Sequence, residues 1–344
     1  MASAFDEMYG LPGAQGVAAG DVMPAYRAIQ RWLEDSPADV LAARRAQAEL
    51  FFRRIGITFA VYGDPDATER LIPFDIVPRI LARAEWQRME AGLKQRVAAL
   101  NAFLADIYGP QEILRAGIVP ADLVLQNPGY CLHMAGRQPP GGIWVHIAGI
   151  DLVRTGPDQF YVLEDNARTP SGVSYMLENR EVMLKLVPEL FETVKVAPVE
   201  TYPEMLLETL ASVSPRRPGR RSSKDHPTCV LLTPGQYNSA FYEHSFLADK
   251  LGIELVEGSD LFVRDDVVYM RTTEGPERVD VIYRRVDDAF IDPLVFNPQS
   301  MLGVPGLMAA YQQGNVTLAN AVGTGISDDK AIYSYMPEIV RFYT

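Results

Sequence analysis

The stretch that decides the fold is HIAGIDLVRTGPDQFYVLEDNARTPSGVSYMLENR, residues 146–180. It contains two apolar runs, residues 147–153 and 160–163, and the cluster Thr-Gly-Pro-Asp at 155–158 separates them. Two apolar runs around a Gly/Pro/Asp cluster predict a β-hairpin, because these turn residues tolerate the tight backbone that reverses the chain. The hairpin organises the rest of the interpretation, because polar side chains are embedded in both of its strands.

Three of those side chains carry oxygen. Glu164 and Asn166 are two positions apart, so a strand points both to the same face. If the strands pair antiparallel, Asp151 lies opposite the region of Glu164 and Asn166. Two carboxylates and an amide suit Mg²⁺, which proteins usually hold with few ligands plus substrate phosphates. The spacing therefore predicts a metal site, and it leaves open the alternative of a surface hairpin whose acids face water.

A loop rich in small hydrogen-bond donors follows the hairpin. It runs from Arg168 to Ser174 and precedes a helix predicted over residues 174–187. A Ser/Gly loop that opens a helix can bind an anion through its backbone N–H groups. We therefore expect Ser171, Gly172 and Ser174 to contact the substrate, beside a cation site suited to phosphoryl chemistry.

Composition excludes several classes of protein. The chain has 344 residues, 48% hydrophobic and 22% charged, as expected of a globular protein with more than one lobe. Its net charge of −12 argues against a nucleic-acid partner or an anionic membrane partner. Cys131 and Cys229 are far apart and predict neither a disulfide framework nor a metal site, so we expect a cytoplasmic protein. No apolar run approaches the roughly 18 residues that span a bilayer.

Four segments are expected along the chain. Residues 1–115 are predicted to be mainly helical, and residues 116–214 to form a central sheet with the hairpin. Residues 228–325 are predicted to form a small α/β unit, and residues 326–344 to begin a further lobe. The basic, Pro/Gly/Ser-rich segment 215–227 is expected to be a solvated linker, since no aromatic residues interleave its arginines.

The predicted α/β unit contains a strand, a helix and a second strand over residues 229–256, a pattern typical of a parallel crossover. A later strand, residues 279–286, delivers Arg284 and Arg285 to its carboxyl end. Ligands of open α/β sheets bind beyond the carboxyl ends of the strands. Arg285 is therefore a candidate site residue.

Three motifs carry a resemblance to a known family. They are YVLEDNARTPSGVSYMLENR at 161–180, YRRVDDAFIDPLVF at 283–296 and ANAVGTGISDDKAIYSYMPE at 319–338. Together they resemble the circularly permuted ATP-grasp family, type 2, and are more distantly similar to the synthetase domain of glutathionylspermidine synthase. The resemblance covers most of the chain from about residue 70 and implies a circularly permuted ATP-grasp fold of the α/β (α+β) class.

The resemblance also implies a reaction: ATP-dependent ligation of a small-molecule or peptide carboxylate to an amine through an acyl-phosphate, with ATP and Mg²⁺. In related synthetases an Asp and a Glu-x-Asn pair hold Mg²⁺, and the matching positions are Asp151, Glu164 and Asn166. In those synthetases an Arg is assigned to the reacting phosphoryl group. Gly149 stands at the corresponding position of this sequence. Arg154, Arg168 and Arg285 are the candidates to replace it.

Proteins of this kind continue past position 344 into a lobe that grips ATP, and Asp329-Lys330 would mark its entry. We therefore expect the chain to be a fragment that by itself is inactive and binds ATP weakly or not at all. Two other functions remain open. One is a non-catalytic binding or scaffold protein with the same fold, and the other is a phosphotransferase or ATPase that uses the same metal site.

Overall fold

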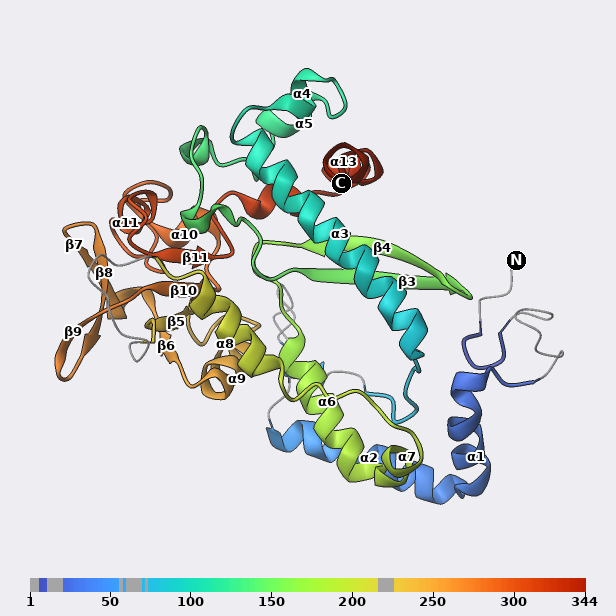
Figure 1. The fold of residues 1–344 in the computed structure, drawn as a ribbon. Helices are drawn as coiled ribbons and strands as arrows, with labels where there is room; N and C mark the ends of the chain where they lie inside the picture. The colour runs from blue at the N-terminus through green and yellow to red at the C-terminus, as the bar shows by residue number, and fades with distance from the viewer. Residues whose placement is uncertain (1–5, 11–20, 56–57, 60–69, 72–73, 216–225) are drawn as a thin grey trace. The chain divides into compact units, whose positions relative to one another are not determined.

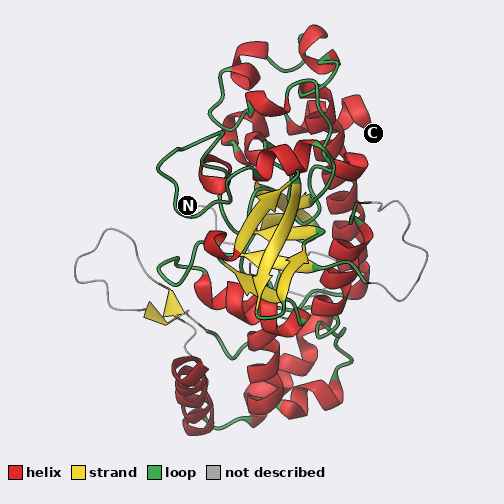
Figure 2. Cartoon of the chain, turned by 90° about the vertical axis from the view of Figure 1, so that its left-hand side faces the viewer, coloured by secondary structure: helices red, strands yellow, loops and turns green. Residues whose placement is uncertain are grey.

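The computed structural model describes residues 6–10, 21–55, 58–59, 70–71, 74–215 and 226–344, so most of the predicted linker at 215–227 lies outside the described residues. The chain forms two compact units (Figure 1). Unit 1 comprises Met1–Gly92, Leu152–Leu163 and Gly172–Glu200, and unit 2 comprises Leu93–Asp151, Glu164–Ser171 and Thr201–Thr344. Helices and strands both contribute (Figure 2), which confirms the predicted α/β class.

Unit 1 is mainly helical in its described part. Its elements are the 3-10 turn η2 (Pro24–Tyr26), α1 (Arg27–Asp35), α2 (Ala38–Ile55), the first part of α3 (Arg83–Ile107), α6 (Val173–Leu186), α7 (Pro188–Thr193) and the short antiparallel pair β1 (Thr58–Phe59) and β2 (Arg70–Leu71). Helix α1 packs on α7, and α2 packs on α6. Glu189 accepts hydrogen bonds from Trp32 Nε1 at 2.9 Å and Arg44 Nη1 at 2.5 Å, which ties α7 to α1 and α2.

Unit 2 contains a four-stranded parallel sheet, with the order β11-β10-β5-β6. Its strands are β5 (Cys229–Leu232), β6 (Glu254–Val256), β10 (Val281–Arg284) and β11 (Thr317–Ala319). Strands β5, β10 and β11 are buried at every position, the pattern of a parallel sheet covered on both faces. Helix α9 (Phe241–Leu251) connects β5 to β6 and ends at Gly252, whose φ of 64° suits a C-terminal cap. The predicted parallel crossover is therefore confirmed.

A three-stranded antiparallel sheet follows in unit 2, made of β7 (Leu261–Arg264), β8 (Val267–Thr272) and β9 (Gly275–Arg278). The remaining helices of this unit are short. They are α4 (Glu112–Arg115), α5 (Ala121–Leu125), α8 (Tyr202–Ser212), α10 (Asp288–Ile291), α11 (Leu307–Gln312), α12 (Lys330–Tyr333) and α13 (Met336–Tyr343). The 3-10 turns are η3 (Leu132–Met134), η4 (Pro140–Gly142), η5 (Gly258–Asp260) and η6 (Thr324–Asp328).

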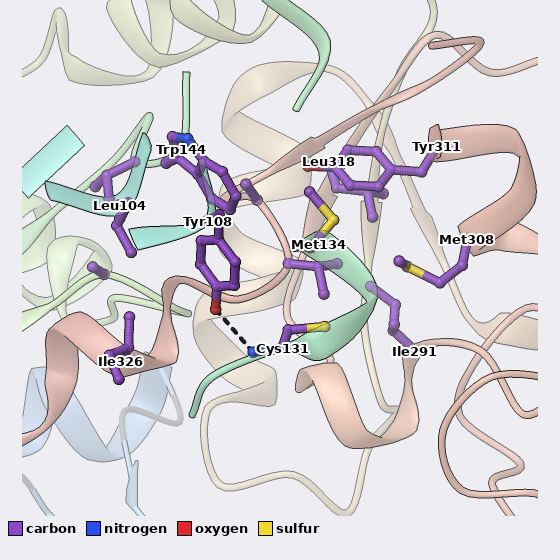
Figure 3. Packing of buried hydrophobic residues seen from close by; sticks show 14 of the residues in the cluster. Leu104, Tyr108, Cys131, Met134, Trp144, Ile291, Met308, Tyr311, Leu318 and Ile326 are labelled. Carbon is purple, nitrogen blue, oxygen red and sulfur yellow. Dashed lines mark hydrogen bonds between the residues drawn. The ribbon is translucent and has the colours of Figure 1, made fainter. Parts of the chain in front are cut away.

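The core of unit 2 is organised around Tyr108 near the end of α3 (Figure 3). Its ring stacks between Tyr130, at a centroid distance of 4.7 Å, and Trp144, at 4.6 Å. Its hydroxyl donates to Gly323 O at 2.9 Å and accepts from Cys131 N at 2.8 Å. A Cβ at Gly323 would lie 2.6 Å from this hydroxyl, so a glycine is required at the loop that follows β11.

The expected hairpin consists of β3 (Gly149–Gly156) and β4 (Gln159–Asn166), which pair with each other. Pro157 and Asp158 form the turn between them. Asp158 has a φ of 54°, a conformation that Asp adopts more readily than most residues. Both strands run across the boundary between the units, and the residues of the predicted metal site all belong to unit 2.

Candidate functional site

The register of the hairpin puts the three expected ligands on one face. Strands β3 and β4 have equal length and are joined by two residues. Gly149 therefore lies opposite Asn166, and Asp151 lies opposite Glu164. In agreement, a Cβ built on Gly149 lies 3.5 Å from the Cβ of Asn166. Residues directly opposite each other in an antiparallel pair share a face. Asp151, Glu164 and Asn166 therefore point to the same side of the hairpin.

The side-chain oxygen atoms on this face make few contacts with other described residues. Asp151 is exposed, and Glu164 and Asn166 are half-buried. Among the residues that the structure describes, the side chains of Asp151 and Asn166 have no hydrogen-bond or ion-pair partner. Glu164 contacts Lys330, with 3.2 Å between Oε2 and Nζ. We call Asp151, Glu164 and Asn166 the oxygen face.

On the opposite side of β4, the end of the strand is closed at Asp165, whereas Tyr161 and Leu163 on the same side are exposed. Asp165, between Glu164 and Asn166, is 2% exposed and accepts three hydrogen bonds from Nε and Nη2 of Arg96 in α3. The guanidinium of Arg96 also lies 5.1 Å from the ring centroid of Tyr333 in α12. Because Asp165 is anchored on the inner side, its two neighbours are directed to the outer side.

Asn320 fastens the open end of the hairpin to the parallel sheet. It follows β11 and is 1% exposed. Its Oδ1 accepts from His146 N at 2.7 Å and Ile147 N at 2.9 Å, just before β3. Its Nδ2 donates to Ile147 O at 2.7 Å and to Ala167 O at 2.9 Å, just after β4. One amide side chain thus holds both strands of the hairpin at the carboxyl end of the sheet, where ligands of α/β folds bind.

The comparisons with known proteins give the family. Residues 78–344 match the family described as a circularly permuted ATPgrasp. The chain belongs to the circularly permuted ATP-grasp family. It is 50% identical to an uncharacterized protein of Synechocystis sp. over 98% of this chain and 68% of that protein. It is 48% identical to an uncharacterized protein of Mycobacterium tuberculosis over 99% of this chain and 59% of that protein.

Two further comparisons bear on this ATP-grasp chain. It is 40% identical to a putative glutamate–cysteine ligase of Frankia casuarinae, over 95% of this chain and 37% of that protein. Its fold is similar to the apo form of a glutathione synthetase-like effector of Globodera pallida, with a TM-score of 0.54 and 14% identity over 90% of this chain and 68% of that one. The chain thus spans between about two fifths and two thirds of the length of these relatives.

Arg168, the first arginine candidate of the ATP-grasp chain, lies beside two carboxylates. Its Nε is 3.1 Å from Asp328 Oδ2, and its Nη1 is 3.5 Å from Asp287 Oδ1. Burial works against the charge, but these two carboxylates raise the pKa of the Arg168 guanidinium. The side chain is 44% exposed, so it is also accessible to a ligand.

Arg285 is buried and holds the loop after the hairpin. Its Nη1 donates to Pro170 O at 2.6 Å, and its Nη2 lies 3.5 Å from Glu243 Oε1. Pro170 in turn packs on Gly149, where an added Cβ would lie 3.0 Å from Pro170 Cβ. The proline ring therefore closes the position that the sequence resemblance matches to an arginine, and Arg285 supports that proline.

Arg154 belongs to unit 1 and is engaged there. Its Nη2 is 2.5 Å from Glu85 Oε1, its Nη1 is 3.6 Å from Glu7 Oε2, and its side chain is 6% exposed. Its guanidinium also lies 5.2 Å from the ring centroid of Phe160. These contacts give Arg154 a structural role within unit 1.

The three expected substrate contacts differ in exposure. Ser171 is exposed and ends its segment of unit 2, whereas Gly172 and Ser174 belong to unit 1. Gly172 has a φ of 108° and precedes the first residue of α6, so it supplies the left-handed conformation that begins the helix. Ser174 is fully buried, which keeps its hydroxyl away from a ligand in this conformation.

Sequence reasoning missed three residues that shape the site: Arg96, Asn320 and the side chain of Lys330. Lys330 lies in the closing motif, where the sequence indicated only the entry to a further lobe. Among the described residues, no group of three or more His, Cys, Asp or Glu side chains is arranged to hold a metal. The predicted set has an Asn as its third member, so it is not a group of that kind. No helix in the described ranges is long and apolar enough to cross a membrane.

Proposed function

We propose that this protein is an ATP-dependent ligase that joins a carboxylate to an amine through an acyl-phosphate. Membership of the ATP-grasp family supports the use of ATP. The relatives named putative glutamate–cysteine ligases support a reaction that forms an amide bond. The activity is proposed for the whole protein, because the chain spans 59% of its mycobacterial relative and 37% of its Frankia relative.

The observation that carries the proposal is the oxygen face. Asp151 and Asn166 have no described partner, although nearby Asp165 is fully paired with Arg96. Unpaired carboxylate and amide oxygens on one face fit Mg²⁺, which accepts one or two carboxylates and leaves positions for phosphate oxygens. When bound, Mg²⁺ neutralises the charge of the β- and γ-phosphates during phosphoryl transfer.

The remaining roles follow from exposure and charge. Asp151, Glu164 and Asn166 hold the metal, and Arg168 turns its accessible N–H groups toward the transferring phosphoryl group. Arg285 acts indirectly, because it supports the backbone of Thr169 and Pro170 through two carbonyl contacts. Ser171, exposed at the end of its unit 2 segment, contacts the substrate carboxylate or its acyl-phosphate. An incoming amine then displaces phosphate, and positive groups stabilise the oxyanion that forms.

No protein nucleophile is needed for this sequence of steps. His146, close to the hairpin, is not suited to act as a base that titrates near neutral pH, because burial lowers the pKa of its imidazole to about 4. The imidazole is therefore neutral under ordinary conditions, as expected of a packed residue just before β3.

A second candidate function is a binding or scaffold protein that kept the fold without the chemistry. The contact between Gly149 and Pro170 favours it, because that contact occupies the place of an arginine assigned to the reacting groups in related synthetases. Binding of metal and nucleotide separates the two functions, since a pure scaffold needs neither.

The test combines a metal titration of this chain with turnover by the whole protein. Mn²⁺, observed by electron paramagnetic resonance, replaces Mg²⁺ as the probe. We expect Glu164→Gln and Asn166→Ala each to weaken Mn²⁺ binding about tenfold or more, by loss of one ligand. In the whole protein both variants should lose metal-dependent ADP release with amino-acid or peptide acceptors.

The matched control is Asp265→Asn in the turn between β7 and β8. Asp265 is exposed and has a φ of 52°, which Asn also tolerates, so this change removes one carboxylate and preserves the backbone. Mn²⁺ binding should be unchanged in this control. Wild-type affinity in the Glu164→Gln and Asn166→Ala variants would remove the metal assignment and leave the scaffold function as the better explanation.

A further inference from the structure

A buried carboxylate lies behind the loop that follows the hairpin. Glu243, in the first turn of α9, has its Oε1 3.5 Å from Nη2 of Arg285, the residue directly after β10. The side chains of Glu243 and Arg285 are 1% and 2% exposed. Two charges taken out of water cost free energy unless they pair with each other and with further polar groups. The pair is therefore expected to serve the fold or the site.

Arg285 joins Glu243 to the backbone of that loop. Its Nη1 donates to Pro170 O at 2.6 Å, and its Nη2 donates to Thr169 O at 3.4 Å. Its Nη1 also donates to the hydroxyl of Tyr283 at 3.2 Å. These three acceptors are neutral, and Glu243 supplies the negative charge that balances the guanidinium. The hydrogen bonds to the loop therefore depend on a residue of α9.

The start of α9 gives Glu243 a fixed position. The next residue, His244, is 2% exposed, and its Nδ1 lies 2.9 Å from Oγ1 of Thr233, directly after β5. Further along the helix, Leu247 and Leu251 are buried. Glu243 is thus anchored to the parallel sheet, and through Arg285 it couples the loop to that sheet.

The loop depends on the charge of Glu243 for a physical reason. Without this carboxylate, the guanidinium of Arg285 would be an uncompensated charge in the interior, and hydration would favour its withdrawal toward solvent. Withdrawal would remove the donors from the carbonyl groups of Thr169 and Pro170. Ser171, the exposed residue that follows, would then lose the backbone that fixes its direction.

We infer that Glu243 is a positioning residue of this site: it keeps Arg285 in place, and Arg285 holds the loop in the conformation that presents Ser171 to the substrate. The inference rests on the proposed function, because the substrate at Ser171 belongs to that function. It adds to the site a residue of α9, an element outside the hairpin and its loop. The ligand class at this loop is the substrate carboxylate or its acyl-phosphate.

The experiment measures the mobility of the loop in this chain. A nitroxide label on Ser171→Cys reports that mobility through the line shape of its electron paramagnetic resonance spectrum. Labelling is specific, because burial raises the pKa of the Cys131 and Cys229 thiols to about 11 and keeps both unreactive near neutral pH. Glu243→Gln should increase the mobile fraction of the label about twofold or more, because the charge that holds Arg285 on the loop is lost.

The matched control is Asp280→Asn, which also neutralises a buried carboxylate beside an arginine. Asp280 is 0% exposed, and its Oδ1 lies 3.6 Å from Nε of Arg278. It directly precedes β10, whereas Arg285 directly follows that strand, so the two pairs lie at opposite ends of it. The label should keep its wild-type spectrum in this control. Equal mobility in Asp280→Asn and Glu243→Gln would mean that the loop responds to any loss of a buried charge, and the inference would fail.

A second variant is included because removing one member of a buried pair can prevent folding. Glu243→Met combined with Arg285→Met removes both charges and retains similar volume, an exchange that buried pairs often tolerate. The label should be mobile in this variant as well, because the carbonyl groups of the loop lose their donors. A label as immobile as in the wild type, in either variant, refutes the inference.

Kinetics and metal binding separate this inference from the function on which it rests. In the whole protein, Glu243→Gln should raise the KM of an amino-acid or peptide substrate that supports ADP release about tenfold, and leave the KM of ATP unchanged. If the metal assignment stands but neither the label nor this KM changes, the role of Glu243 is refuted and the proposed function remains. If Glu164→Gln leaves Mn²⁺ binding unchanged, the proposed function fails, while the label still shows whether Glu243 holds the loop.

Discussion

The guanidinium of Arg96 holds both carboxylate oxygens of Asp165, with Nε 2.8 Å from Oδ1 and Nη2 2.6 Å from Oδ2. The two residues are 69 positions apart in the chain, and the side chain of Asp165 is fully buried. This pair determines which way the end of β4 faces. With Asp165 held inside, Glu164 and Asn166 are left on the outer side, where a ligand can reach them.

The first prediction concerns this pair. Arg96→Met should lower the free energy of unfolding by about 3–5 kcal/mol, because it leaves the buried carboxylate of Asp165 uncompensated. Urea denaturation measures the loss. The control on the same helix is Arg88→Met, which breaks an exposed pair with Asp158 and should cost less than about 1 kcal/mol. Equal losses in the two variants would contradict the structural role of Asp165.

The second prediction concerns Asn320. Asn320→Asp preserves the shape but places a carboxylate against the carbonyl oxygens of Ile147 and Ala167. We expect a loss of about 3 kcal/mol in unfolding free energy, because two buried acceptors lose their donor. Mn²⁺ affinity should fall as well, since the hairpin loses its attachment to the sheet.

The control for that variant is Asn297→Asp. Asn297 uses only its Oδ1, which accepts from Gln299 N at 3.0 Å in an exposed turn, and an aspartate supplies the same acceptor. Urea midpoints of the control and the wild type should agree closely. A comparable loss in both variants would mean that the hydrogen bonds donated by Asn320 do not stabilise the junction.

The third prediction concerns the glycines at the two ends of β3. Gly149→Ala should destabilise the protein by about 1–3 kcal/mol, because its Cβ would lie 3.0 Å from the rigid ring of Pro170. Gly156→Ala should cost less, because its Cβ meets the end of the flexible Gln159 side chain. Thermal denaturation of both variants shows which substitution lowers the stability more. The reverse order would show that Pro170 yields more easily to an added Cβ than the Gln159 side chain does.

The fourth prediction concerns pH. Burial lowers the pKa of His146 to about 4 and that of His244 to about 3, against about 6.5 in an unfolded chain. Below pH 6.5 the unfolded chain therefore binds protons that the folded chain does not. The free energy of unfolding should fall as pH decreases from 6.5 toward 4, by up to about 1.4 kcal/mol per pH unit for each histidine.

Urea denaturation at several pH values between 7.5 and 5 measures that slope. His244→Asn should flatten it, because one of the two depressed imidazoles is removed. His226→Asn replaces an exposed histidine instead and should leave the wild-type slope in place. An unchanged slope in His244→Asn would show that His244 does not contribute to acid sensitivity.

Much of the fold could be predicted because the sequence patterns that indicate it lie within short segments of the chain. The Gly-Pro-Asp cluster placed the hairpin, and the strand–helix–strand pattern over residues 229–256 placed the crossover. The side-chain environments could not be predicted in this way. In the sequence, Arg154 and Arg285 were equally good candidate site residues. In the structure, Arg154 is paired with Glu85, and Arg285 is buried and donates a hydrogen bond to Pro170 O. Those partners lie far away in the sequence.

The sequence by itself determined that Glu164 and Asn166 share a face, because strand alternation depends only on neighbouring residues. The register that puts Asp151 opposite Glu164 was decided by the folded hairpin, whose strands are joined by two residues. The tertiary structure alone decided which acids remain available to a ligand. Asp165 is neutralised by Arg96 of α3, and Glu164 meets Lys330 of α12. The physical reason is that charge pairing and burial depend on contacts between distant segments, which periodicity does not encode.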